Sequence, residues 1–296
     1  YLIYVKLPFI LFDITLGIIL ALSFTEYKKR LLILWMFNPI TLWATSAIGQ
    51  LDIYPAFFIG LAYLLIKKGQ LSWAALSLGT GGAIKSAPFL LIPLLLGLAK
   101  NSKERILYLS LAAVPYLLTV IPYLGLSDFR QNALFAPQLS KILFTTLPLS
   151  GLEVIYVVPA LLAFFYLLYY SKERSISDFL TFSVAILLST LTFTHFHMQW
   201  FLWVTPFLFI WFLNNWQRGG IQLAAWLLFM SWLVMLFLFE SSLQVKLFAP
   251  LDPSFDQAIG LKEALTVNQS IFLRNLSATI FASSGIFLIW KMLRTG

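Results

Sequence analysis

The chain has 296 residues, of which 60% are hydrophobic and only 11% are charged. A soluble domain carries about 25% charged residues, so this composition excludes an ordinary soluble enzyme and predicts an integral membrane protein. The net charge of +8 could indicate nucleic-acid binding, but the basic residues lie in short loops between apolar runs. We therefore interpret them as topology signals and expect no nucleic-acid partner. The absence of cysteine excludes disulfides and thiolate metal sites.

The apolar runs predict about eleven membrane-crossing helices of about 14 to 22 residues, since roughly 20 residues span a hydrocarbon core. The alternating pattern of a membrane β-barrel is missing, so we expect an all-α bundle that forms a single transmembrane domain over residues 1–296. We also expect a monomer that is surrounded by membrane lipids. In chain order, the predicted helices are Leu7–Phe24, Leu31–Ile48, Ile53–Ile66, Leu71–Ile84, Ser86–Ala99, Ile106–Leu124, Leu152–Tyr170, Ile176–Phe193, Gln199–Leu213, Ile221–Glu240 and Ser270–Lys291.

The basic residues predict which loops share a side of the membrane. The segment from Leu71 to Ala99 has basic loops at both ends, so it must cross an even number of times, and we expect a hairpin that turns at Lys85. With this hairpin, thirteen of the 20 basic residues fall on one face, which the positive-inside rule makes cytoplasmic. They are Lys28, Lys29, Arg30, Lys67, Lys68, Lys100, Lys103, Arg105, Lys172, Arg174, Arg218, Lys291 and Arg294.

One polar stretch, NPITLWATSAIGQLD from Asn38 to Asp52, interrupts two apolar runs. A charge in hydrocarbon costs several kcal/mol, so we expect Asn38, Gln50 and Asp52 to line a polar cavity at the outer face, and this cavity to be the active site. The Asp52 carboxylate would then orient an acceptor hydroxyl, hold a metal or meet a sugar hydroxyl. Alternatively, Asp52 caps the helix that begins at Ile53.

Two further outer-face cations are candidates for binding an anionic substrate. Lys85, at the tip of the predicted hairpin, would bind a lipid-linked phosphate as a point charge, or would extend toward lipid headgroups. Arg130, in the loop from Ser127 to Ser150, would meet an anionic donor.

The segment His195 to Gln199 lies at a junction between two predicted helices. In an extended turn His195 and His197 share one face, and they and Gln199 would contact a phosphate leaving group or a sugar hydroxyl. The alternative is an interfacial aromatic belt with Trp200 and Trp203. The metal question stays open, because neither the spacing His-Glu-x-x-His nor a cysteine supports a zinc site.

The segments KLPFILFD, FNP…GQLD, IKSAPFLLIP and HFHMQWFLWVTPF, from Lys6 to Phe207, resemble the membrane glycosyltransferases of the GT-C class. They are similar to the polyprenyl-phosphate-mannose-dependent enzymes of bacteria and archaea. They are more distantly similar to the eukaryotic GPI mannosyltransferase and the dolichyl-phosphate-glucose glucosyltransferases of N-glycan assembly.

This resemblance implies a hexosyltransferase, with mannose favoured. Its donor would be a polyprenyl- or dolichyl-phosphate-linked sugar, and its acceptor a lipid-, glycan- or protein-linked hydroxyl on the extracytoplasmic or lumenal face. The resemblance also implies a catalytic carboxylate in the first outer loop, after the first helix. Because no such loop matches here, we expect that helix and loop to precede Tyr1, and Asp52 to be a second acidic group. No cofactor beyond the lipid-linked donor is implied, and a divalent metal is left open.

Two other functions compete with sugar transfer. A flippase for lipid-linked sugars, or another multi-pass transporter, should carry polar residues near the membrane midplane and an internal repeat. Only Asp13 and the glycines from Gly79 to Gly82 are deep in predicted helices, and no repeat is evident. A non-catalytic scaffold leaves the outer-face polar groups unexplained.

Overall fold

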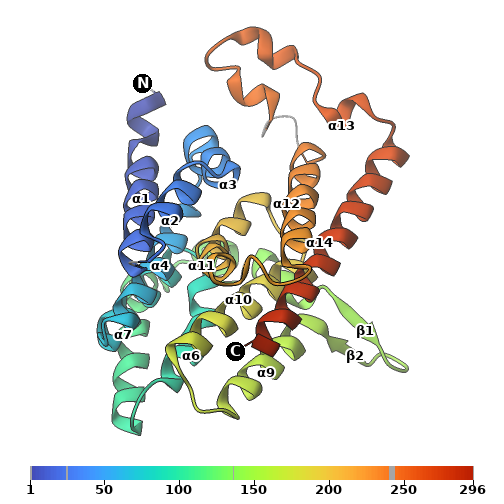
Figure 1. Cartoon of the computed structure of the whole chain (residues 1–296). Coiled ribbons are helices and arrows are strands. Elements are labelled where there is room, and N and C mark those ends of the chain that lie inside the picture. Colours follow the sequence, from blue (N-terminus) through green and yellow to red (C-terminus); the bar gives the residue numbers. More distant parts are fainter. Residues whose placement is uncertain (1, 25, 136, 240–243, 296) are drawn as a thin grey trace.

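The computed structural model describes residues 2–24, 26–135, 137–239 and 244–295, and helices dominate this part of the chain (Figure 1). The all-α prediction is thus confirmed. In the described part, five helical segments are long and apolar enough to cross a membrane: Tyr4–Ser23, Lys28–Ile48, Ser102–Tyr123, Ile176–Phe193 and Val267–Arg294. Several other apolar helices have 10–17 residues. The larger count of about eleven crossings therefore stays a prediction, and the end of the predicted helix at Glu240 lies outside the described residues.

The elements follow one another along the chain with short connections. The longer α-helices are α1 (Leu2–Ser23), α2 (Lys28–Met36), α4 (Ile53–Lys67), α5 (Leu71–Ile84), α6 (Ile92–Gly97), α7 (Ser102–Val120), α9 (Val157–Tyr170), α10 (Ile176–Phe193), α11 (Thr205–Asn215), α12 (Ile221–Phe237) and α14 (Val267–Thr295). The short ones are α3 (Pro39–Thr41), α8 (Ser127–Phe129) and α13 (Leu261–Ala264). Two π-helices are η1 (Leu42–Ile48) and η4 (Arg130–Leu134). The described 3₁₀-helices are η2 (Ala87–Leu91), η3 (Ile121–Tyr123), η5 (Pro137–Leu143), η6 (Met198–Trp203), η8 (Val245–Phe248) and η9 (Pro253–Gln257).

Helix packing divides into two groups around a central helix. The helices α1, α4, α5 and α7 pack in succession, while α12 and α14 lie side by side on the other side of the body (Figure 1). Between them, α10 contacts α4, α9, α11 and α14. Most residues of α10 are buried, so it forms the centre of the bundle.

The predicted helix Leu31–Ile48 is not continuous, because the Asn38-Pro39 pair breaks it. Pro39 lacks a backbone N–H and stands at the first position of α3, where no donor is needed. Asn38 caps this new start, since its Oδ1 accepts from the Thr41 backbone N–H at 3.0 Å. Its Nδ2 donates to the Trp35 carbonyl at 2.6 Å, so the cap also closes the preceding helix.

The carboxylate of Asp13, inside the first helix, accepts hydrogen bonds from side chains of neighbouring helices. The Trp35 indole Nε1 donates to Asp13 Oδ1 at 2.8 Å, and the Thr45 hydroxyl donates to Oδ2 at 2.8 Å. Asp13 is 7% exposed. The carboxylate thereby joins α1 to α2 and η1, and both of its oxygens accept hydrogen bonds in the bundle interior.

Prolines also break the predicted helix Ser86–Ala99, which becomes η2 followed by α6. Three tyrosines of α9 donate to carbonyls of this interrupted segment: Tyr166 to Leu90 at 2.7 Å, Tyr169 to Leu94 at 2.9 Å and Tyr170 to Pro93 at 2.7 Å. Within a membrane, the carbonyls of an interrupted helix must find their partners inside the protein. The tyrosines give three carbonyls of this segment a side-chain donor.

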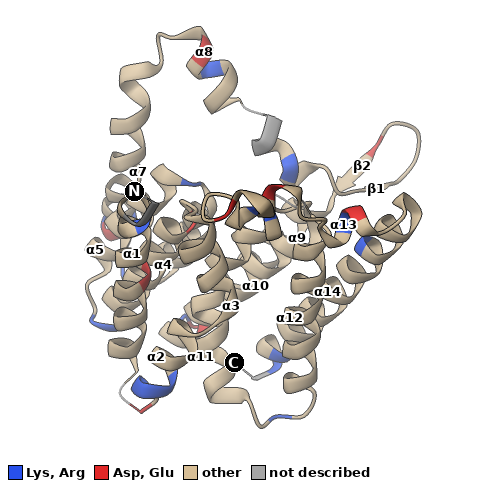
Figure 2. Cartoon of the chain, turned by 90° about the horizontal axis from the view of Figure 1, so that it is seen from above, with Lys and Arg blue, Asp and Glu red and all other residues tan. Residues whose placement is uncertain are grey.

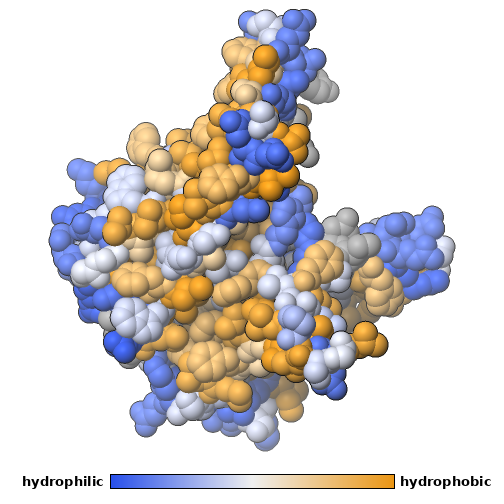
Figure 3. All heavy atoms as spheres, turned by 90° about the vertical axis from the view of Figure 1, so that its right-hand side faces the viewer, coloured by the Kyte–Doolittle hydropathy of each residue, from blue (hydrophilic) through white to orange (hydrophobic). Residues whose placement is uncertain are grey.

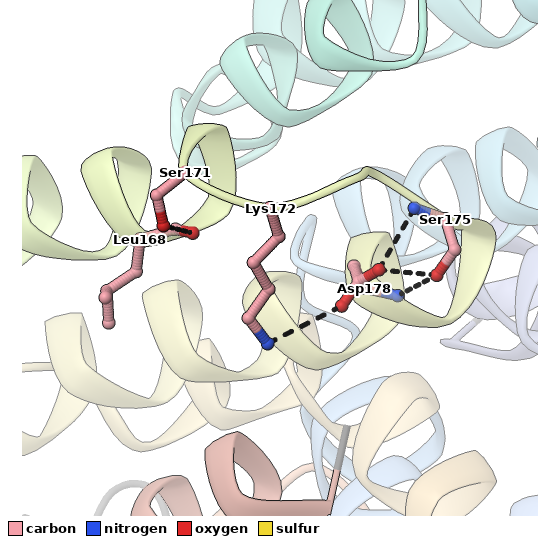
Figure 4. Close-up of polar contacts among 5 residues, drawn as sticks. All are labelled: Leu168, Ser171, Lys172, Ser175 and Asp178. Carbon is pink, nitrogen blue, oxygen red and sulfur yellow. Dashed lines mark hydrogen bonds and ion pairs between the residues drawn. The ribbon is translucent and has the colours of Figure 1, made fainter.

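The turn from α9 to α10 is closed by a capping box (Figure 4). The Ser175 hydroxyl accepts from the Asp178 backbone N–H at 3.1 Å, and Asp178 Oδ2 accepts from the Ser175 backbone N–H at 3.0 Å. Lys172 Nζ lies 4.0 Å from Asp178 Oδ1, and the Ser171 hydroxyl donates to the Leu168 carbonyl at 2.9 Å. The two hydrogen bonds between Ser175 and Asp178 satisfy backbone N–H donors at the start of α10.

One part of the predicted helix Leu152–Tyr170 is wrong. Its first residues form strand β2 (Val154–Tyr156), which pairs antiparallel with β1 (Thr146–Pro148), with Leu147 opposite Ile155. The hairpin and α8 project from the helical body (Figure 2). β-branched residues at Val154 and Ile155 favour an extended backbone, and the run Leu152–Tyr170 was apolar enough to hide this preference.

The surface of the body is apolar between polar margins. Hydrophobic residues cover much of the face in Figure 3, and hydrophilic residues gather at its edges. In Figure 2, basic residues lie at the start of α2 and around the C-terminus in the lower half, whereas α8 and the β-hairpin project from the upper half. This distribution is what a membrane-spanning bundle requires. The assignment of one half to the cytoplasm stays a prediction.

Candidate functional site

The ends of the α4–α5 hairpin bring together Asp52 and Lys85. The two helices have 15 and 14 residues, and therefore similar lengths of about 22 Å, and a turn of three residues joins them. The residue before α4 and the residue after α5 consequently lie at the same end of the hairpin. Lys85 Nζ donates to Asp52 Oδ2 at 2.6 Å. This pair is the centre of the candidate site.

Local backbone geometry directs Asp52 toward Lys85. Gly49 ends η1 in the left-handed region, with φ of 77°, where a residue with a Cβ would be strained. The chain then turns through Gln50 and Leu51 into α4. Asp52 precedes α4 but makes no side-chain cap hydrogen bond, so the capping interpretation is wrong. Its carboxylate is instead committed to the cation at the end of α5.

The Asp52 carboxylate is fully buried, whereas Lys85 reaches the surface. The Asp52 side chain is 0% exposed and the Lys85 side chain 29%. Oδ1 of Asp52 and the indole Nε1 of Trp203 are both buried, and neither makes a hydrogen bond to a described residue. Burial raises the pKa of Asp52, while Lys85, the nearby Trp203 indole and His197 lower it, and the net direction is upward. A buried carboxylate oxygen without a donor calls for an explanation, because most such atoms are paired.

His197 lies on the same side and brings a further ionisable group to this region. Its Nε2 is 3.3 Å from Lys141 Nζ, and its ring packs on Trp200 with centroids 5.5 Å apart. Burial lowers the pKa of His197, Lys141, His195 and Lys85 lower it further, and Asp52 opposes them. His197 is therefore close enough to interact with both Asp52 and Lys85. These three residues and Lys141 share one region of the structure.

The short helix η6 places the aromatic side chains of this region. In a 3₁₀-helix, side chains three residues apart eclipse each other. Trp200 and Trp203 accordingly stack, with centroids 5.0 Å apart and an angle of 17° between the rings. Lys141 Nζ lies 5.5 Å from the Trp200 ring centroid. Because η6 packs on α4, the Trp203 indole is carried toward the start of that helix, where Asp52 lies.

His195 faces a different space from the ion pair. It is exposed and lines a cavity of about 180 Å³ with Thr192, Arg274 and Asn275. Burial, Lys141 and Arg274 lower its pKa, in that order. The two histidines thus lie close enough to interact, but His195 belongs to a pocket whose walls come from α10, α12 and α14.

Four other candidate residues lie outside the ion pair's contacts. Asn38 is the α3 cap, lines an apolar cavity, and is 7% exposed. Gln50 is half-buried, and its backbone N–H donates to the Ala44 carbonyl at 2.8 Å. Gln199 is half-buried in η6. Arg130 is exposed, and its Nη1 donates to the Leu124 carbonyl of its own loop at 2.6 Å.

Sequence reasoning missed three residues of this region: Lys141, Trp203 and Arg274. Lys141 and Arg274 belong to the seven basic residues that the topology leaves on the outer face, so the charge count already carried a signal for both. Trp203 was seen only as part of an aromatic belt. Among the described histidine, aspartate and glutamate side chains, no three gather as a metal group would require.

Two larger cavities are apolar and lie beside the ion pair's region, without Asp52 or Lys85 in their walls. One, of about 470 Å³, lies between α2, α3, α11 and α12, and the other, of about 670 Å³, between η1, α12 and η8. Trp43 and Trp232, whose ring centroids are 5.9 Å apart, line the second cavity. Phe201 of η6 lines the first, so η6 lies between this cavity and Asp52.

Comparison of the chain with family models, with curated proteins and with solved structures finds no match.

The pKa shifts lead to a prediction for Lys141. Replacing Lys141 with glutamine should raise the pKa of both His195 and His197, because the cation lowers both. The chain has only two histidines, so an NMR titration of a histidine-labelled sample resolves each one. Lys262→Gln, an exposed lysine of α13, is the control and should leave both titrations unchanged. Equal titrations in the Lys141 variant and the wild type would contradict the contact.

The same shifts set the sign of the pH dependence. Because the folded-state pKa of each histidine lies below 6.5, the folded protein binds protons less readily than the unfolded chain. The stability that the neutral histidines contribute is therefore present above pH 6.5 and is lost as the pH falls through the folded-state pKa.

Proposed function

We propose that the chain is a membrane glycosyltransferase that moves a hexose, with mannose favoured, from a polyprenyl-phosphate carrier to a lipid-, glycan- or protein-linked hydroxyl on the extracytoplasmic face. The observation that carries the proposal is the buried Asp52 carboxylate, paired with Lys85 and near His197 and Lys141. A carboxylate and two lysine cations in one partly desolvated place are what transfer from a sugar phosphate requires.

The chemistry assigns a part to each group. The acceptor oxygen forms a bond to the anomeric carbon while the bond from that carbon to the phosphate oxygen breaks. The hydroxyl proton passes to Asp52, whose raised pKa makes it the better base near neutral pH. The departing phosphate carries negative charge, which Lys85 and Lys141 stabilise. Lys85 is the exposed member of the pair, so it meets the phosphate first, and its movement frees the carboxylate.

The apolar cavities support a lipid-borne donor. A polyprenyl chain needs a hydrocarbon-lined space that is open toward the bilayer, and both cavities have almost entirely apolar walls. They lie on the α3–η1 side of η6, whereas the ion pair lies against Trp203. This arrangement lets a carrier tail lie in the cavities while its phosphate passes η6 toward Lys85.

The test is transfer by the purified full-length protein. The protein is supplied with polyprenyl-phosphate-linked radiolabelled mannose or glucose and with a mixture of hydroxyl acceptors. Radioactivity should appear in a new product with release of polyprenyl phosphate. If no product forms, and the protein instead moves lipid-linked sugar between the leaflets of a vesicle, the transporter alternative replaces this proposal.

The membrane topology gives a separate prediction. Because the chain has no native cysteine, a single introduced cysteine reports on one position alone. A cysteine at Glu153, exposed on the β-hairpin, should react from outside the cell with a membrane-impermeant maleimide. A cysteine at Lys103, exposed at the start of α7, should react only after the membrane is opened. Asp52 is too buried to report on sidedness. Labelling of both positions from the same side would contradict the proposed topology.

A further inference from the structure

A polar cavity lies beside the segment that carries the two histidines. It occupies about 180 Å³ between the end of α10, the end of α12 and the first turns of α14. Five polar residues line it: Thr192, Thr194, His195, Arg274 and Asn275. The remaining walls include Met198, Met235, Ala278 and Phe281, so the polar groups stand over an apolar floor.

The polar groups of this cavity have unused hydrogen-bonding capacity. The Thr192 hydroxyl is buried and makes no hydrogen bond within the part of the chain that the structure describes. Arg274 is half-buried, and the ion pairs found among the described residues do not include it. A partly desolvated guanidinium without a counter-ion is costly, because burying an unpaired charge loses its hydration. Among the described residues, the cavity is therefore electropositive and rich in donors.

The packing of α14 on α10 places the Thr192 hydroxyl away from Arg274. A Cβ on Gly285 would lie 2.7 Å from the Thr192 hydroxyl oxygen, so glycine at this position helps α14 to approach α10 closely. Arg274 and Asn275 lie about three turns, or about 16 Å, earlier on the same helix. The Thr192 hydroxyl therefore lies at the far end of the cavity from Arg274.

The cavity differs chemically from the Asp52 site. Its described lining residues include no carboxylate, so none of them is a base of the kind that Asp52 provides. They offer a guanidinium, a carboxamide, a hydroxyl and an imidazole, which all donate hydrogen bonds. An arginine beside neutral donors matches the tetrahedral oxygens of a phosphate group.

We propose that this cavity binds a phosphate group, held by Arg274 with His195 and Asn275 as further donors. The proposal does not rest on sugar transfer, because it concerns binding alone. The phosphate is that of a lipid headgroup or a free phosphate ion. The apolar floor, formed in part by Ala278 and Phe281 of a membrane-length helix, is compatible with the glycerol and acyl carbons below a headgroup.

The experiment compares Arg274→Gln with Arg130→Gln in the full-length protein. Arg130 is an exposed arginine outside the cavity whose guanidinium contacts only its own loop in the described structure, so it controls for the loss of one positive charge. Native mass spectrometry in detergent measures binding of phosphatidic acid and, as the matched neutral lipid, diacylglycerol with the same chains. Wild type and the Arg130 variant should bind phosphatidic acid about tenfold or more tightly than the Arg274 variant does. Diacylglycerol should bind weakly to all three.

A second variant guards against a general loss of folding. Asn275→Ala removes the carboxamide of an exposed side chain, and it should weaken phosphatidic acid binding by a few fold. Inorganic phosphate that displaces the lipid at millimolar concentration identifies free phosphate as a sufficient ligand, and phosphate that fails to displace it identifies the lipid. Equal binding of phosphatidic acid by wild type and the Arg274 variant overturns the proposal. Equal binding of phosphatidic acid and diacylglycerol to wild type also overturns it.

Discussion

Asp52→Asn is expected to lower sugar transfer to below about a tenth of the wild-type rate, because a positioned base contributes about 10²- to 10⁴-fold. Asparagine keeps the shape of the side chain but cannot accept the hydroxyl proton. Expression and folding should be maintained, since Lys85 is partly exposed and can turn toward water when its partner becomes neutral. The measurement is the initial rate of transfer at saturating donor, with protein quantified in the same membranes.

A matched control separates this effect from a general change of charge. Asp128→Asn alters an exposed aspartate of α8 and should leave transfer near the wild-type rate. The pH profile adds a second readout. If Asp52 takes the proton, the wild-type rate falls at acidic pH as the carboxylate is protonated, and the residual rate of the Asp52 variant loses that fall. Near-normal transfer by the Asp52 variant would remove this residue from the reaction.

The second large effect is expected on stability, from Lys85→Met. This change leaves the Asp52 carboxylate buried without its cation, and breaking a buried pair in this way costs about 3–5 kcal/mol. The cost here should lie at or below the lower end of that range, because Lys85 is 29% exposed and the pair is partly screened. Chemical unfolding in detergent micelles gives the free energy directly.

A double variant shows whether the loss of stability in Lys85→Met comes from the unpaired Asp52 carboxylate. Asp52→Asn combined with Lys85→Met removes both charges, so it should be more stable than Lys85→Met alone. Lys262→Met, on exposed α13, controls for the removal of a lysine and should change the unfolding free energy little. A double variant that is no more stable than the Lys85 variant would show that lost packing, and not the unpaired carboxylate, causes the destabilisation.

The sequence was most informative where a pattern is local. Apolar runs predicted the helical class, and the basic loops at both ends of Leu71–Ala99 predicted a turn at Lys85. The structure brings Lys85 to Asp52, 33 residues away in the chain, because the α4–α5 hairpin has arms of nearly equal length. That contact follows from helix lengths that a sequence pattern can provide.

The parts that sequence reasoning missed depend on long-range packing. Lys141 meets His197 across 56 residues, and no local pattern connects a loop lysine to a distant histidine. The sequence pattern also does not separate a capping residue from a site residue. Asn38 and Asp52 are both expected in the site, but Asn38 caps α3, whereas Asp52 makes no cap hydrogen bond and pairs with Lys85. Both side chains suit both tasks, and only the neighbouring helix decides between them.

The tyrosines of α9 bear on how the protein is made. The segment from Ala87 to Gly97 leaves the ribosome before α9 exists, because its hydroxyl partners lie 75–77 residues further along the chain. Until those residues are translated, the carbonyls of Leu90, Pro93 and Leu94 have no phenol to accept from, and the insertion machinery or interfacial water must shield them. Biogenesis of this region is therefore obliged to wait for α9, and a ribosome stalled before Tyr166 would hold an unfinished hairpin.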